Sequence, residues 1–206
     1  RRGERTFAPW EDMEAEMRAE GIGLWSLETR HPVRDFDVLG FTLQYEMTYT
    51  NVLNMLDLAG IPVWARDRGE ADPIVICGGS GSFNPEPLSP FVDAFFLGEG
   101  EEAVVELVDR IREWKRRGVP RQERLRDLLS MPGVYVPAFY EARYDDAGRF
   151  ASLEPLTPEA PRVIRRRTVE QLPPPLVKPI VPFLQTIHDR ASVEIQRGCT
   201  QGCRFC

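Results

Sequence analysis

The sequence predicts an α/β fold with an open, mostly parallel, Rossmann-like sheet, and two observations support this. Apolar segments at residues 36–43, 73–79 and 91–97 have the length and composition of strands buried on both faces. Helical apolar patterns over residues 49–59 and 104–114 follow the first and the third of them. In such sheets, ligands lie at the carboxyl ends of the strands.

The helices have recognisable ends. Residues 11–20 predict a first helix, because Met13 and Met17 are four positions apart and Gly21 can end it. Gly60 and Pro62 follow the helix of residues 49–59. The helix that begins near Glu101 ends at Gly118 after three basic residues, which suits the helix dipole.

The remaining segments are shorter. Residues 24–27 favour a strand, and residues 121–129 favour a helix. Residues 135–144 and 149–153 flank an Asp-Asp-Ala-Gly turn and predict a hairpin. Prolines then accumulate between Pro155 and Pro175, as in a stiff linker, before a last strand at residues 191–196.

Composition restricts the class of protein. The 206 residues are 42% hydrophobic and 28% charged, as in soluble globular proteins, and no apolar run is long enough to cross a membrane. A net charge of −6 argues against non-specific nucleic-acid binding through the bulk surface. Free thiols without a leader sequence favour the cytoplasm.

Three of the four cysteines, Cys199, Cys203 and Cys206, lie within eight residues with C-x3-C-x2-C spacing. Such spacing is typical of iron–sulfur clusters held by thiolates. A four-iron cluster with three protein ligands leaves one iron open for a substrate or cofactor. A structural zinc site is the alternative, with His188, Cys77 or a residue outside the chain as its fourth ligand. A disulfide framework fits the odd cysteine number poorly.

Residues 191–196 and Arg197-Gly198 precede this cysteine run, and the whole segment resembles the signature of the radical S-adenosylmethionine (radical SAM) superfamily. The resemblance implies a 4Fe–4S cluster on Cys199, Cys203 and Cys206, with SAM bound at the open iron and Phe205 packed near its adenine. It also implies reductive cleavage of SAM to a 5′-deoxyadenosyl radical, with an electron donor such as flavodoxin or ferredoxin. The substrate stays unknown.

Glycine-rich segments follow two of the predicted strands. Gly78-Gly-Ser-Gly81 and Asn84-Pro-Glu-Pro87 follow residues 73–79, and a tight turn explains the glycines as well as ligand binding does. Gly98-Glu-Gly-Glu-Glu102 opens the long helix, where its carboxylates suit the helix dipole but would repel a phosphate.

Together with the cysteine run, these segments resemble the cobalamin-binding radical SAM proteins, in particular a largely uncharacterised bacterial group. The resemblance implies a corrinoid lying against the sheet, with its nucleotide tail in a slot lined by Thr42, Gly78 and Gly79. The Asp-x-His-x-x-Gly element that ligates cobalt in many such domains is absent from the chain. A domain that binds no corrinoid and serves as a substrate-recognition scaffold is an open alternative.

The resemblance implies three parts. Residues 1–119 form a cobalamin-binding-like α/β domain lacking its first strand, residues 120–185 a helix, hairpin and proline-rich linker, and residues 186–206 the start of a β/α barrel. Because such a barrel needs about 250 residues, we expect the chain to be a fragment that is inactive alone. A different class remains open, namely a non-catalytic ligand-binding module with structural zinc.

Three further residue sets have ordinary explanations. Cys77 lies in an apolar segment and is expected to be a buried small hydrophobe. His31 and His188 have no second metal ligand at helical or turn spacing. Arg165, Arg166 and Arg167 are expected on a solvated surface.

Overall fold

The computed structural model describes residues 3–174, 193–198 and 200–202. The chain divides into two units, Arg1–Thr168 and Val169–Cys206. The described residues of the second unit form no helix or strand. The strand predicted for residues 191–196 is therefore not formed at 193–196, and residues 191–192 lie outside the described part.

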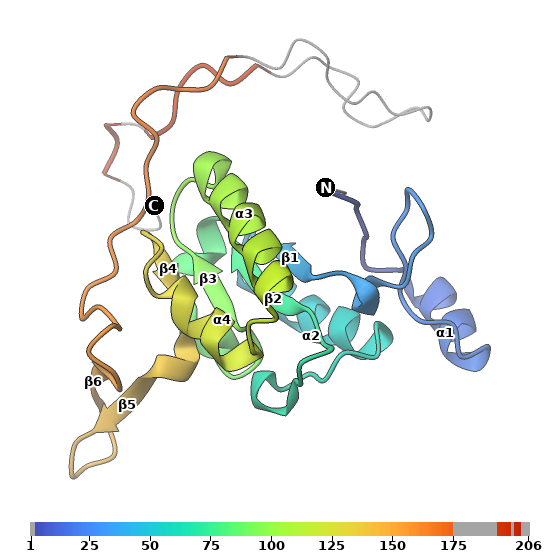
Figure 1. Ribbon diagram of the computed structural model, residues 1–206, viewed down its shortest axis with the longest axis horizontal. Coiled ribbons are helices and arrows are strands. Elements are labelled where there is room, and N and C mark those ends of the chain that lie inside the picture. The colour runs from blue at the N-terminus through green and yellow to red at the C-terminus, as the bar shows by residue number, and fades with distance from the viewer. Residues whose placement is uncertain (1–2, 175–192, 199, 203–206) are drawn as a thin grey trace. The chain divides into compact units, whose positions relative to one another are not determined.

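The first unit contains a four-stranded sheet of order β1-β2-β3-β4 (Figure 1). β1 (Val38–Thr42), β2 (Ile74–Gly78) and β3 (Ala94–Phe96) run parallel, and β4 (Val134–Tyr135) pairs antiparallel with β3. β5 (Tyr140–Tyr144) and β6 (Phe150–Pro155) form a separate hairpin. The predicted mostly parallel α/β sheet is confirmed.

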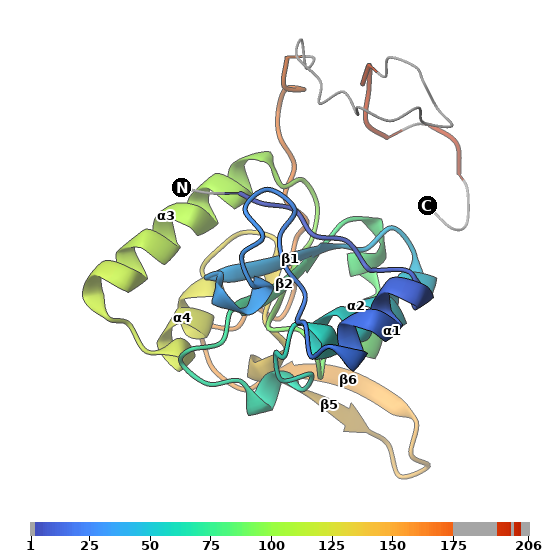
Figure 2. The same ribbon diagram turned by 90° about the vertical axis from the view of Figure 1, so that its right-hand side faces the viewer.

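Helices cover both faces of this sheet (Figure 2). α1 (Glu11–Ala19) and α2 (Tyr49–Leu58) supply side chains to one apolar cluster, with Leu39, Val75 and Cys77 from the strands. α3 (Glu101–Arg117) and α4 (Arg121–Leu128) supply the other cluster on the opposite face. Side chains alternate along a strand, so successive residues of β1 and β2 face different clusters.

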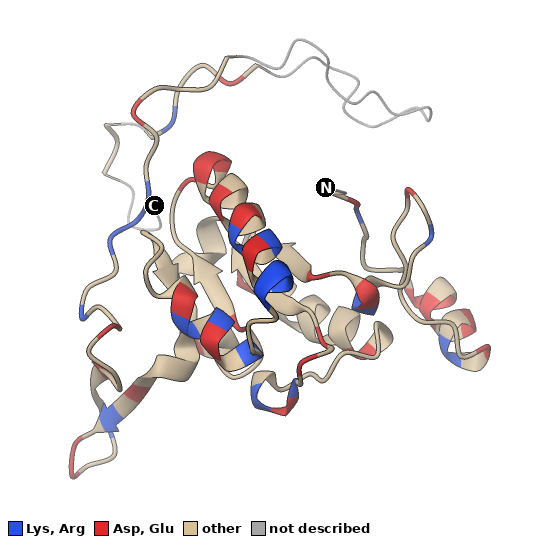
Figure 3. Ribbon diagram, viewed as in Figure 1, with Lys and Arg blue, Asp and Glu red and all other residues tan. Residues whose placement is uncertain are grey.

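α3 is the longest of the described helices, and its charges follow its dipole. Acidic Glu101 and Glu102 lie in its first turn and three basic residues in its last, as Figure 3 shows. Gly118 ends the helix with a left-handed φ of 64°, which a residue without a Cβ adopts at low cost. None of the helices among the described residues is long and apolar enough to span a membrane.

Two predicted elements differ from the structure. Residues 24–27 form no strand, since Trp25 makes a single bridge to Pro32. The predicted strand of residues 135–144 is divided by a 3₁₀ turn at Pro137–Phe139. Proline fixes its own φ and cannot donate to a ladder, so the segment before Pro137 joins the main sheet as β4 and the segment after it forms the hairpin.

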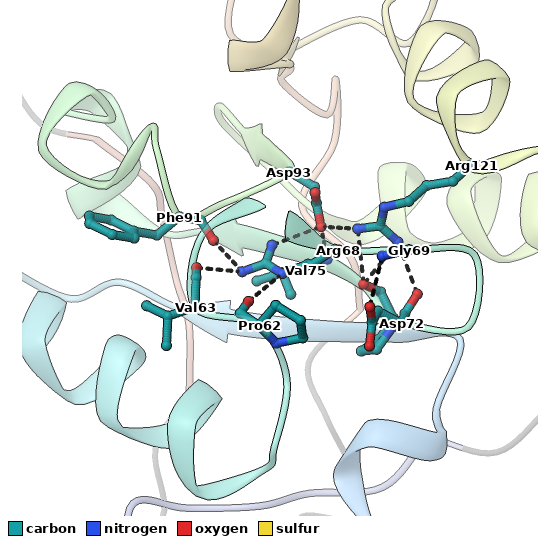
Figure 4. Close-up of polar contacts among 10 residues, drawn as sticks. Pro62, Val63, Arg68, Gly69, Asp72, Val75, Phe91, Asp93 and Arg121 are labelled. Atoms are coloured by element: carbon teal, nitrogen blue, oxygen red, sulfur yellow. Dashed lines mark hydrogen bonds and ion pairs between the residues drawn. The ribbon is translucent and has the colours of Figure 1, made fainter. Parts of the chain in front are cut away.

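A buried ionic network joins the amino ends of β2, β3 and α4 (Figure 4). Asp93 Oδ2 accepts hydrogen bonds from Arg68 Nη1 at 3.0 Å, from Arg121 Nη2 at 2.7 Å and from the Val75 amide at 2.7 Å. The Asp93 and Arg68 side chains are 2% and 0% exposed. Arg68 also donates to three backbone carbonyls, those of Pro62, Val63 and Phe91. The network therefore fixes the loops that enter the sheet.

Candidate functional site at the carboxyl edge of the sheet

The carboxyl edge of the sheet, where β1 and β2 end, brings two of the predicted site residues together. Thr42 and Gly78 are Cα partners in the parallel register. By strand alternation both lie on the face that packs against α3. Thr42 is exposed and Gly78 half-buried, so a ligand at this edge can reach both.

Gly78 and Gly79 serve different purposes. A Cβ at Gly78 would meet Phe96 at 3.9 Å, an ordinary contact, so packing does not require a glycine there. Gly79 has φ of +98°, and a Cβ on it would lie 2.7 Å from the Leu43 carbonyl oxygen. The chain itself therefore fills the space beside Gly79, and this glycine is needed for a tight turn.

The loop after β2 is fixed to the loop after β1 by hydrogen bonds. The Gly81 amide donates to the Leu43 carbonyl at 2.9 Å, and Ser80 Oγ donates to the Gln44 carbonyl at 2.9 Å. The Tyr49 hydroxyl lies 2.9 Å from the carbonyls of both Gly81 and Asn84. Burial raises the pKa of Tyr49, which keeps the hydroxyl protonated as a donor.

Exposed apolar side chains on these two loops were missed by the sequence analysis. Tyr45 and Met47 on the first loop are 55% and 80% exposed, and Phe83 on the second is 57% exposed. Large apolar residues directly after buried strands were the available signal. Exposed apolar surface at strand ends suits a flat organic ligand.

The segment around Arg167 occupies the carboxyl end of β3. The Arg167 amide donates to the Leu97 carbonyl and the Glu99 amide to the Arg167 carbonyl, both at 2.9 Å. A Cβ at Gly98 would lie 2.1 Å from the Arg167 carbonyl oxygen. A Cβ at Gly133 would lie 2.7 Å from the Leu97 carbonyl oxygen. We call residues 164–168 the strap.

The Arg167 side chain holds the strap on α3. Arg167 Nη1 lies 2.8 Å from Glu106 and Nη2 3.2 Å from Glu102. The hydrogen bond from Arg167 lowers the pKa of Glu106. Because the Arg167 side chain is 18% exposed, the prediction of a solvated surface is wrong for this arginine. The carboxylates in the first two turns of α3 therefore bind the guanidinium group of Arg167.

The predicted cluster ligands cannot be placed. Cys199, Cys203 and Cys206 lie outside the described residues, as do Phe205 and His188. Within the described part, no group of three or more His, Cys, Asp and Glu side chains could hold a metal. Cys77 is fully buried, and burial raises its pKa to about 12, so its thiol stays neutral and unreactive.

The fold defines a doubly wound α/β domain, in which the carboxyl edge of the sheet is the candidate ligand-binding edge. Residues 2–137 match the family described as radical SAM proteins, N-terminal. This match covers well over half of the chain, which therefore belongs to that family. No curated protein and no solved structure shows significant similarity to the chain.

Proposed function

We propose that the chain is part of a radical SAM enzyme whose 4Fe–4S cluster is held by Cys199, Cys203 and Cys206. Membership of the radical SAM N-terminal family carries this proposal, together with the C-x3-C-x2-C spacing. When bound, such a cluster supplies the electron that cleaves SAM to methionine and a 5′-deoxyadenosyl radical. Three thiolates leave one iron open for SAM, and Phe205 is the residue proposed to pack near its adenine.

The residues just before the first cysteine support a sharp entry into this loop. Gly198 has a left-handed φ of 73°, with no atom near enough to force that conformation. Arg197 Nε pairs with Glu194 at 2.6 Å and Gln196 Nε2 donates to the Gly198 carbonyl at 3.2 Å. A bend at Arg197 and the left-handed Gly198 therefore change the chain direction just before the cysteine run.

Anaerobic reconstitution tests the cluster. A longer product of the gene, extended beyond Cys206, is treated with iron and sulfide, and we expect about four irons per chain. Replacing Cys199, Cys203 and Cys206 with alanine abolishes iron binding and release of 5′-deoxyadenosine, whereas the control Cys77→Ala leaves both intact. Stoichiometric zinc without iron would instead support the non-catalytic zinc module.

The first unit is proposed to bind cobalamin at the carboxyl edge, which would make methyl transfer the leading reaction. Thr42 and Gly78 lie side by side there, Gly78 has room beside it, and the neighbouring loops expose Tyr45, Met47 and Phe83. These residues fit a flat macrocycle. Gly79, which is exposed, is proposed to line the slot with its backbone, because Leu43 leaves no space there for a side chain.

Titration with hydroxocobalamin tests this second proposal. We expect micromolar binding that Gly78→Val weakens at least about tenfold, a change of about 1.4 kcal/mol. Gly23→Val is the matched control, since a Cβ at Gly23 meets only the Leu58 carbonyl oxygen at 3.5 Å. Absence of binding would leave the first unit as a recognition scaffold and would not affect the cluster proposal.

A further inference from the structure

A cavity of about 390 Å³ lies at the amino edge of the sheet, beside the buried ionic network of Figure 4. Small-molecule sites in proteins have volumes of about 300–1,000 Å³, so this cavity is large enough for a small ligand. Its lining comes from four separate segments, residues 64–68, 89–93, 121–125 and 137–138. Because β2 and β3 begin at this edge, the cavity is distinct from the candidate site at the carboxyl edge.

The lining of this cavity is positively charged. Its charged residues are three arginines and one aspartate, a formal charge of +2, whereas the whole chain carries −6. Two nearby carboxylates do not line the cavity and bond backbone amides instead. Asp72 accepts from the Gly69 amide at 2.8 Å, and Glu70 accepts from the Arg121 amide at 2.8 Å. The cavity therefore favours a negatively charged ligand.

Asp93 offsets only one of the two buried arginines. The side chains of Arg68 and Arg121 are 0% and 7% exposed, and both bond the same Asp93 oxygen. Burial lowers the pKa of Arg68; the Asp93 charge opposes this effect, and the neighbouring Arg121 adds to it. Arg121 Nη1 and Nη2 bond protein oxygens, but its Nε donates to none of the described residues. Since buried charges are stable when paired, a second anion beside Arg121 would stabilise this group.

Arg66 adds a third guanidinium group on the exposed side of the cavity. Its guanidinium carbon lies 4.8 Å from the centre of the Trp64 ring, a cation–π contact, and Trp64 packs against Phe91 with ring centroids 4.6 Å apart. The one carboxylate paired with Arg66 is that of Asp67, at 3.7 Å, with side chains 76% and 57% exposed. Such an exposed ion pair is weak, so Arg66 is oriented by Trp64 and available to an anion.

The remainder of the lining is mainly apolar. Val92 and Leu125 are buried side chains of the cavity wall, and two prolines and Ala138 complete it. An inorganic anion would leave this apolar part unfilled, whereas an organic anion covers it and removes its surface from water. The ligand that fits is therefore charged at one end and apolar at the other.

We propose that the cavity at the amino edge of the sheet binds a small organic carboxylate with an apolar body. Arg66 and the Nε of Arg121 donate to the carboxylate, and the apolar body packs against Val92 and Leu125. The two buried arginines favour the ionised form of the ligand. The proposal does not depend on the cluster or on cobalamin.

An NMR titration of the chain with cinnamate tests this site. We expect cinnamate to shift the indole N–H of Trp64 and the amides of Ala65 and Gln122, with a Kd of about 1 mM for a ligand of this size. Cinnamamide, its neutral counterpart, should bind at least about tenfold more weakly, because it lacks the charge that the arginines bind. The proposal is overturned by equal binding of the amide, by no shift at about 10 mM cinnamate, or by shifts at Gly78 without shifts at Trp64.

Two substitutions in the cavity provide the second test. Ala138→Phe should weaken cinnamate binding at least about tenfold, because the added ring occupies the cavity, and Arg66→Gln should weaken it about two- to fivefold. Both residues are exposed, so the Tm should change by less than about 2 °C. The control Arg143→Gln removes an exposed arginine that pairs with Glu141 on the hairpin, and should leave binding unchanged. Unchanged binding in either cavity variant would mean that cinnamate binds elsewhere, and the proposal would fail.

Discussion

Removing the charge of Asp93 should strongly destabilise the first unit. Asp93→Asn keeps the size of the side chain but leaves Arg68 and Arg121 facing each other without an anion. Burial already lowers the pKa of Arg68, and the Asp93 charge opposes that effect. Breaking a buried ion pair by removing one partner costs about 3–5 kcal/mol. Because domains are stable by about 5–15 kcal/mol in total, this is a large fraction.

Urea denaturation followed by circular dichroism measures the effect. We expect the midpoint of Asp93→Asn to fall by about 1–2 M urea with little change in slope. The control Glu113→Gln removes the partner of Arg116 in an exposed ion pair, with side chains 44% and 74% exposed, and should leave the midpoint unchanged. A loss below about 1 kcal/mol for Asp93→Asn would refute the reasoning, because it would mean that water or rearrangement neutralises both arginines.

Two further predictions concern the strap and Cys77. Gly98→Ala places a Cβ against the Arg167 carbonyl, so the strap should be cleaved faster by protease. Gly118→Ala is the control, because a Cβ there would have no atom within 4 Å, and it should not change cleavage of the strap. Above pH 9 the Cys77 thiol ionises in the unfolded chain, while in the folded chain its pKa is about 12. The free energy of unfolding should therefore fall as the pH rises. In urea titrations between pH 9 and 11, Cys77→Val should make this decline shallower by up to about 1.4 kcal/mol per pH unit. An unchanged slope of the free energy of unfolding against pH would contradict a buried neutral thiol.

Local patterns were sufficient to predict most of the sheet and its helices. The apolar segments that became β1, β2 and β3 are each bounded by turn residues, and Gly118 ends α3 where its spacing indicated. The error at residues 135–144 arose because β4 forms by pairing with β3, a contact nearly 40 positions away along the chain. Period-two alternation cannot show which strand a segment will join.

Long-range polar contacts were the hardest features to predict. Arg68, Arg121 and Arg167 each look like ordinary surface arginines, and their partners lie 25, 28 and 61 positions away. One signal did exist, since Asp93 lies inside an apolar segment, and a buried carboxylate requires a cation or several donors. The identity of those cations depends on how the loops fold together.

The long-range contacts of glycines were equally hard to predict from the sequence. These contacts decide which glycine substitution gives an informative cofactor experiment. In the sequence, Gly78, Gly79 and Gly98 are equivalent candidates for a close approach to a ligand. In the structure, Gly79 and Gly98 are occupied by the carbonyls of Leu43 and Arg167, and a side chain at either would damage the fold whether or not a corrinoid binds. Gly78, next to Thr42, instead has room for a Cβ, whose nearest neighbour would be Phe96 at 3.9 Å. Weaker hydroxocobalamin binding by Gly78→Val with an unchanged Tm would therefore report on the site itself, whereas the same loss in Gly79→Val would report on folding.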